Sequence, residues 1–67
     1  MNKPYDRTAV AIQQGRDWAQ TEIAAGRSVT QESAWYAARV YVENGPFQSI
    51  YFDAAIAFAD DFAECSL

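Results

Sequence analysis

The 67-residue chain has no histidine and a single cysteine, and these shortages exclude several kinds of site. Acid–base catalysis most often uses histidine, and the usual zinc sites need histidine or several cysteines. Cys65 cannot close a disulfide within the chain, and we expect an exposed thiol there, with a disulfide between copies as the alternative. The three glycines stand apart and form no phosphate-binding loop. We therefore predict no catalytic residue, no metal site, no cofactor and no enzymatic activity.

Long apolar runs are also missing. No stretch approaches the roughly 18 apolar residues that a membrane span needs. The first residues, MNKPYDR, lack the apolar centre of a signal peptide. Together with the free cysteine, these features predict a cytoplasmic protein that does not contact a membrane.

Positive charge is missing from the second part of the chain. Residues 1–39 hold five cations and four acids, a net of +1, whereas residues 40–67 hold five acids and no cation, a net of −5, and together they give −4. A net acidic chain is unsuited to direct binding of nucleic acid or of anionic membranes through bulk electrostatics. The five acids of the second part are Glu43, Asp53, Asp60, Asp61 and Glu64.

Apolar residues, by contrast, are abundant and follow a helical period. They make up 51% of the chain, and aromatic residues 15%, which excludes the disordered class. A chain of this length forms one domain, covering residues 1–67. The period predicts helices at about residues 4–25, 30–43 and 47–64. We therefore predict an all-α fold, a small three-helix bundle.

The junction around Asn44 and Gly45 admits a second interpretation. Asn-Gly between β-branched and aromatic residues is a strong signal for a β-hairpin, which would make the fold α+β. The same residues followed by Pro46 are also typical of a helix end. The alanine-rich flanks favour the helical interpretation.

Gly15 lies inside the apolar stripe of the first predicted helix, where glycine costs about 1 kcal/mol relative to alanine. Either the helix kinks there or a large side chain from another helix approaches closely, and we favour the close approach. The second predicted helix begins at one of two overlapping capping signals, Ser28 with Gln31 or Thr30 itself.

The second predicted helix is apolar around well over half of its circumference, with a polar side limited to Glu32, Tyr36, Arg39 and Glu43. A helix of that kind is central in the fold or buried on two sides. In so small a protein, burial on two sides predicts a homodimer. Trp18, Trp35 and Tyr36 are candidate anchors in an interface, although aromatic residues at helical spacing are more often core.

The third predicted helix carries Asp53, Asp60, Asp61 and Glu64 on the side opposite its apolar arc. Three of these acids lie near its C-terminal end, where the helix dipole favours cations. We interpret the four as contact residues for a basic partner, with Glu43 at the near edge. The alternative is a solvated face that only keeps the domain soluble. Chelation of a divalent cation is disfavoured, because the spacing matches no calcium loop.

Two functions from different classes remain. The first is a small acidic inhibitor or adaptor that docks on a basic, nucleic-acid-handling host protein or complex and, in its strong form, takes the place of nucleic acid. In size, acidity and helical, aromatic-rich composition the chain resembles phage or mobile-element anti-defence proteins of the anti-CRISPR and DNA-mimic kind, with no shared motif. The second is a self-associating structural or regulatory module that acts through the apolar face of the second helix.

Overall fold

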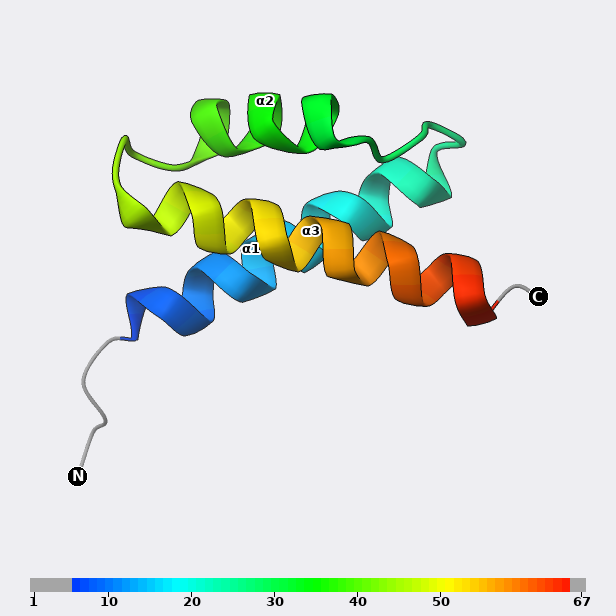
Figure 1. Ribbon diagram of the computed structural model, residues 1–67, viewed down its shortest axis with the longest axis horizontal. Coiled ribbons are helices and arrows are strands. Elements are labelled where there is room, and N and C mark those ends of the chain that lie inside the picture. The colour runs from blue at the N-terminus through cyan, green and yellow to red at the C-terminus, as the bar shows by residue number, and fades with distance from the viewer. Residues whose placement is uncertain (1–5, 66–67) are drawn as a thin grey trace.

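The computed structural model describes residues 6–65, except for the side chain of Cys65, and contains three helices (Figure 1). They are α1 (Arg7–Ala24), α2 (Gln31–Tyr41) and α3 (Pro46–Cys65). The predicted three-helix bundle is confirmed. The described residues contain no strand, so the hairpin alternative at Asn44 and Gly45 is wrong. The predicted start of the first helix at about residue 4 and the expectation for the Cys65 thiol fall outside the described part.

Both ends of α1 follow from local chemistry. The Asp6 carboxylate accepts hydrogen bonds from the backbone N–H groups of Thr8 (3.0 Å) and Ala9 (3.3 Å), which would otherwise lack acceptors at a helix start. At the other end Gly26 adopts a φ of 80° and donates its N–H to the Ile23 carbonyl, as a helix-ending glycine does.

Thr30, and not Ser28, caps α2. The Ser33 backbone N–H donates to the Thr30 hydroxyl (3.0 Å), and the Thr30 N–H donates to the Ser33 hydroxyl (2.9 Å). This reciprocal pair is a capping box with serine in its third helical position. The helix ends at Tyr41, earlier than predicted, because Val42 is extended (φ −124°, ψ 136°). Pro46 is then the first residue of α3, a position where its missing N–H costs nothing.

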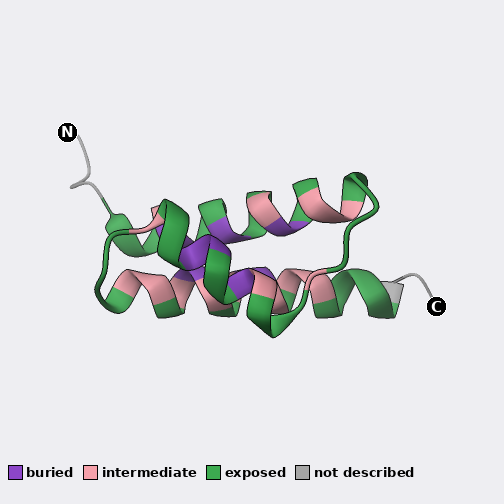
Figure 2. Ribbon diagram, turned by 90° about the horizontal axis from the view of Figure 1, so that it is seen from above, coloured by how far each residue is buried: buried purple, intermediate pink, exposed green. Residues whose placement is uncertain are grey.

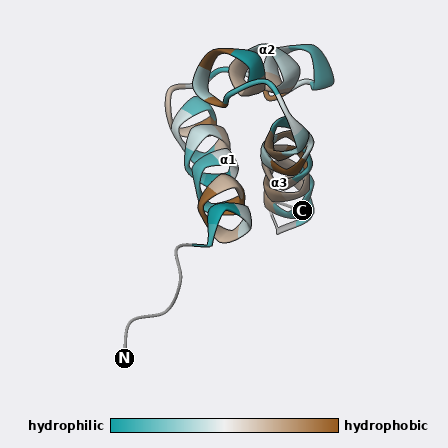
Figure 3. Cartoon of the chain, turned by 90° about the vertical axis from the view of Figure 1, so that its left-hand side faces the viewer, coloured by the Kyte–Doolittle hydropathy of each residue, from teal (hydrophilic) through white to brown (hydrophobic). Residues whose placement is uncertain are grey.

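Helices α1 and α3 run in the same direction, and α2 returns across both of them (Figures 1 and 3). The core between them consists of small residues, with Tyr51 as the only fully buried large side chain among the described residues. The buried residues gather near the middle of the bundle, and the C-terminal end of α3 is exposed (Figure 2). The buried alanines are Ala11, Ala19, Ala34, Ala37, Ala38 and Ala55.

The close approach predicted at Gly15 is confirmed, but the expected large side chain is not there, because the backbone of α3 makes the approach. Gly15 is buried, and a Cβ placed there would overlap the Tyr51 carbonyl oxygen and stand 3.2 Å from the Ala54 Cβ. The backbones of α1 and α3 therefore meet at this point. With small residues in the interface, the two helices form the base on which α2 lies.

Candidate functional site

Four exposed carboxylates line the solvent side of α3, and we call Asp53, Asp60, Asp61 and Glu64 the acidic ridge. At 100° per residue Asp53, Asp60 and Glu64 fall within about 40° of one another, and Asp61 extends the ridge to one side. The ridge runs for roughly 16 Å along the helix axis at 1.5 Å per residue. The structure thus places these four predicted residues on one continuous surface.

The ridge differs from four of the five other acids in having no intramolecular partner among residues 6–65, and Glu32 on α2 is the exception. Asp6 caps α1, Asp17 accepts a hydrogen bond from the Gln13 amide (2.8 Å), and Glu22 forms an ion pair with Arg27. None of the four ridge carboxylates has a hydrogen bond or an ion pair within the described part of the chain. Their charges are therefore available to a partner.

The structure does not bring Glu43 to the acid cluster at the C-terminal end of α3. Glu43 lies in the connection before α3, and its carboxylate is 3.9 Å from the Arg7 guanidinium. Helix α3 begins after Glu43, and its rise of 1.5 Å per residue places Glu43 roughly 25 Å or more from Glu64. Arg7 also lies over the ring of Phe47, at 4.6 Å from the ring centroid, so this end of the molecule carries a cation as well as an acid.

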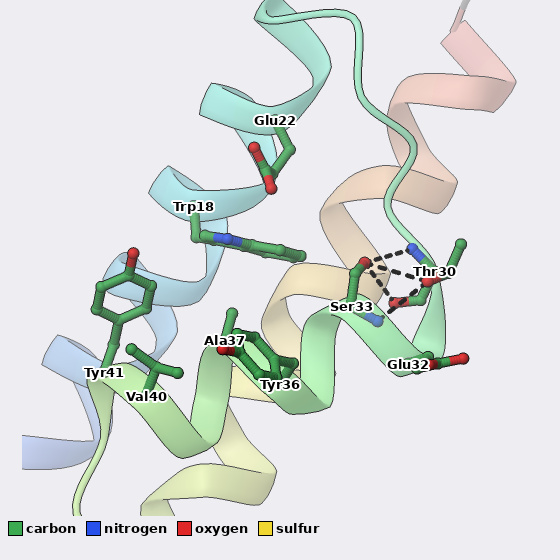
Figure 4. Close-up of a pocket in the computed structure, with 9 residues that line it drawn as sticks. All are labelled: Trp18, Glu22, Thr30, Glu32, Ser33, Tyr36, Ala37, Val40 and Tyr41. Atoms are coloured by element: carbon green, nitrogen blue, oxygen red, sulfur yellow. Dashed lines mark hydrogen bonds between the residues drawn. The ribbon is translucent and has the colours of Figure 1, made fainter.

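A second surface feature, which the sequence did not predict, is a hollow of about 530 Å³ between α1 and α2 (Figure 4). We call it the aromatic groove. Trp18 forms its α1 side, while Tyr36, Val40 and Tyr41 line its α2 side. The Glu22 carboxylate points toward the space above the Trp18 indole (Figure 4). Periodicity had grouped Tyr36 with the polar side of its helix, and the only signal for a groove was the surplus of aromatic residues.

Two acids line the groove, Glu32 and Glu22, and Arg27 forms an ion pair with Glu22. The Nε and Nη2 atoms of Arg27 each lie 2.6 Å from Oε2 of Glu22. The hydrogen bond to this carboxylate and its negative charge raise the pKa of Arg27 above its usual value. Burial raises the pKa of Tyr51 to about 12, with smaller contributions from the charges of Tyr41 and Glu22. Arg27 and Tyr51 therefore each keep one protonation state at neutral pH, and neither titrates as an acid–base catalyst would.

The described residues hold no cluster of three metal-ligating side chains. Over the same part of the chain, no helix has the length and apolar character that crossing a bilayer requires. Comparisons of the chain with protein-family models, with curated proteins and with solved structures find no match, and its function must be inferred from its own residues.

Proposed function

We propose that this protein is a non-catalytic inhibitor or adaptor that docks the acidic ridge on a basic surface of another protein. The partner's surface would be one that handles nucleic acid, and in the strongest form of the proposal the ridge occupies the place of a phosphate backbone, as in a DNA mimic. Phage or mobile-element anti-defence proteins of the anti-CRISPR and DNA-mimic kind share the small size and acidity of this chain. The observation that carries the proposal is that all four ridge carboxylates are exposed and unpaired within residues 6–65 and lie on one helix. Of the other five acids, Asp6, Asp17, Glu22 and Glu43 have partners, and Glu32 stands alone on α2.

The physical basis is electrostatic. Carboxylates fixed on a helix present negative charge at set spacings, and lysine or arginine side chains of a partner gain charge-assisted hydrogen bonds with them. Complementary potentials speed up encounter and make association sensitive to salt. A face that served only for solubility would work equally well with lysine or arginine among the acids, whereas α3 has neither residue.

The test is a capture experiment with extract from the cells in which the protein acts. The wild type is compared with a variant carrying Asp60→Lys and Asp61→Lys, and bound proteins are eluted in a salt gradient. We expect the wild type to retain a basic, nucleic-acid-handling protein that moderate salt releases, and the variant to lose it. Duplex DNA added to the purified pair should displace the partner if the ridge occupies a nucleic-acid site.

A matched control separates the ridge from bulk charge. Changing Gln13, Gln14, Gln20 and Ala25, which are all exposed on or beside α1, to lysine moves the net charge from −4 to 0, as the double Asp→Lys change does. This control should keep the partner. Retention of the same partner by the folded Asp60/Asp61 variant would refute the proposal.

The self-associating module remains the second candidate, because α2 leaves large apolar side chains uncovered. Tyr36 is 72% exposed and Val40 is 56% exposed. Association through these apolar side chains weakens less with ionic strength than docking through the ridge, where all four contact residues are charged. The salt gradient therefore distinguishes the two functions.

A further inference from the structure

The outer face of α2 combines exposed aromatic residues with one charge of each sign. We define this face as Glu32, Trp35, Tyr36, Arg39 and Val40, all of which are exposed. Trp35 is held in place because its ring stacks on that of Phe52, with centroids 4.4 Å apart and an interplanar angle of 14°. An aromatic side chain that is fixed before binding loses little entropy when a partner covers it.

The two charges of this face have no partner within residues 6–65. Neither Glu32 nor Arg39 forms an ion pair or a hydrogen bond there. They are seven residues apart, so they fall on the same side of α2 about 10 Å from one another. Together with Trp35 and Tyr36 they border a shared hollow of about 610 Å³.

This arrangement is self-complementary. If a second α2 packs antiparallel on the first, with the two-fold axis near Trp35 and Tyr36, the Glu32 of each copy meets the Arg39 of the other. A two-fold interface requires that the same patch match itself in this way. The aromatic side chains then lie at the centre and the charged pairs at the rim, which is the usual anatomy of a protein interface.

We propose that a second copy of this chain covers the outer face of α2, forming an antiparallel two-fold dimer with two Glu32–Arg39 pairs. Covering the exposed parts of these five side chains removes on the order of 500 Å² per copy, or about 1,000 Å² in total, which is the lower limit for a specific interface. Such a dimer should be weak and reversible.

The dimer would leave the acidic ridge free, because the ridge lies on the side of α3 that no helix covers. Each dimer would then present two ridges. This inference does not rest on the acidic ridge, and it specifies the geometry of the second candidate function, self-association through α2. It can be tested on the purified protein alone, without the partner of the ridge.

The experiment is sedimentation equilibrium of the full-length chain between about 1 μM and 1 mM, which covers the range of weak dimers. We expect a concentration-dependent dimer for the wild type. Glu32→Arg and Arg39→Glu should each raise the dissociation constant about tenfold or more, because two attractive pairs become repulsive. The variant with both changes restores the pairs in reverse and should return to within about threefold of the wild type.

Bulk charge cannot imitate this pattern. Glu32→Arg moves the net charge from −4 to −2 and Arg39→Glu moves it from −4 to −6, yet both should weaken the dimer. Arg16→Glu, a reversal at an exposed site on α1, should leave the dissociation constant unchanged. Tyr36→Ala should weaken the dimer without lowering the monomer's melting temperature, since this side chain is 72% exposed in the monomer.

Circular dichroism checks that each variant is folded, because the reversed charges oppose the dipole of α2. The proposal is overturned if the wild type stays monomeric up to the highest concentration. It is equally overturned if the double reversal associates as weakly as the single ones, or if Arg16→Glu weakens the dimer as much as Arg39→Glu does.

Discussion

Gly15 sets the distance between α1 and α3. Its missing Cβ lets the Tyr51 carbonyl of α3 come closer than any side chain would permit. The next nearest side-chain atom, the Ala54 Cβ, also belongs to α3. A flexible side chain in the way could rotate, whereas a backbone carbonyl within α3 cannot move without moving the helix. The residue is therefore required by packing, although glycine is a poor helix former.

We expect Gly15→Ala to destabilise the protein by a net of about 1–2 kcal/mol. Alanine gains about 1 kcal/mol in helix propensity, but the added methyl group must push α1 and α3 apart, and overpacking of this kind outweighs the gain. Urea unfolding followed by circular dichroism measures the change.

Gly45→Ala is the matched control. A Cβ at Gly45 has no neighbour closer than the Glu43 carbonyl oxygen at 4.0 Å, and the residue has no positive φ. Its stability should stay within about 0.5 kcal/mol of the wild type, as for most surface substitutions. If the two variants were equally stable, the close approach at Gly15 would not constrain the fold.

At the scale of elements, α3 has acids where its dipole disfavours them. Asp60, Asp61 and Glu64 lie in its last turns, and its last turn has no basic residue. Asp60 and Glu64 also repel one another, because residues four apart are neighbours on a helix surface. The acids at this end of α3 therefore cost stability.

We expect Glu64→Lys to stabilise the protein by about 0.5–1 kcal/mol at low ionic strength, since it places a cation at the helix C-terminus and removes the repulsion with Asp60. Thermal melting at low salt measures the gain, which should shrink in about 1 M salt because the charges are then screened. Asp53→Lys makes the same charge change in the middle of α3 and should gain less. An equal gain at both positions would show that total charge, and not the dipole, is responsible.

At the scale of the whole molecule, the sequence predicted what repeats along one helix and missed what depends on how helices meet. Asp53 and Glu64 could be placed on one face because a helix fixes their relative angle. The groove beside Trp18 and Tyr36 could not be foreseen, because periodicity does not reveal that α2 lies across α1 and leaves a hollow there. The end of the second helix was misplaced by two residues, since Val42 is apolar enough to continue the pattern although its backbone is extended.

Tyr51 joins all three helices. It lies on α3, its ring centroid is 6.4 Å from that of Trp18 on α1, and it forms a buried cluster with Ala37 and Ala38 of α2. It is 1% exposed, so a charge on its oxygen would be placed where the three helices meet. Its ionisation therefore concerns the stability of the whole fold.

We expect alkaline pH to unfold the protein partly through Tyr51. Burial first, and the charges of Tyr41 and Glu22 next, raise its pKa to about 12 in the folded state, whereas an unfolded tyrosine titrates near 10. The folded state then holds this proton more tightly, so the stabilisation is complete below about pH 10 and is lost as the pH rises toward 12, a loss on the order of 2–3 kcal/mol. Tyr51→Phe keeps the ring and removes the titration, so its free energy of unfolding should fall less than that of the wild type between about pH 9 and pH 12. Urea unfolding of both proteins across this range measures the difference, and parallel curves would show that Tyr51 does not couple ionisation to folding.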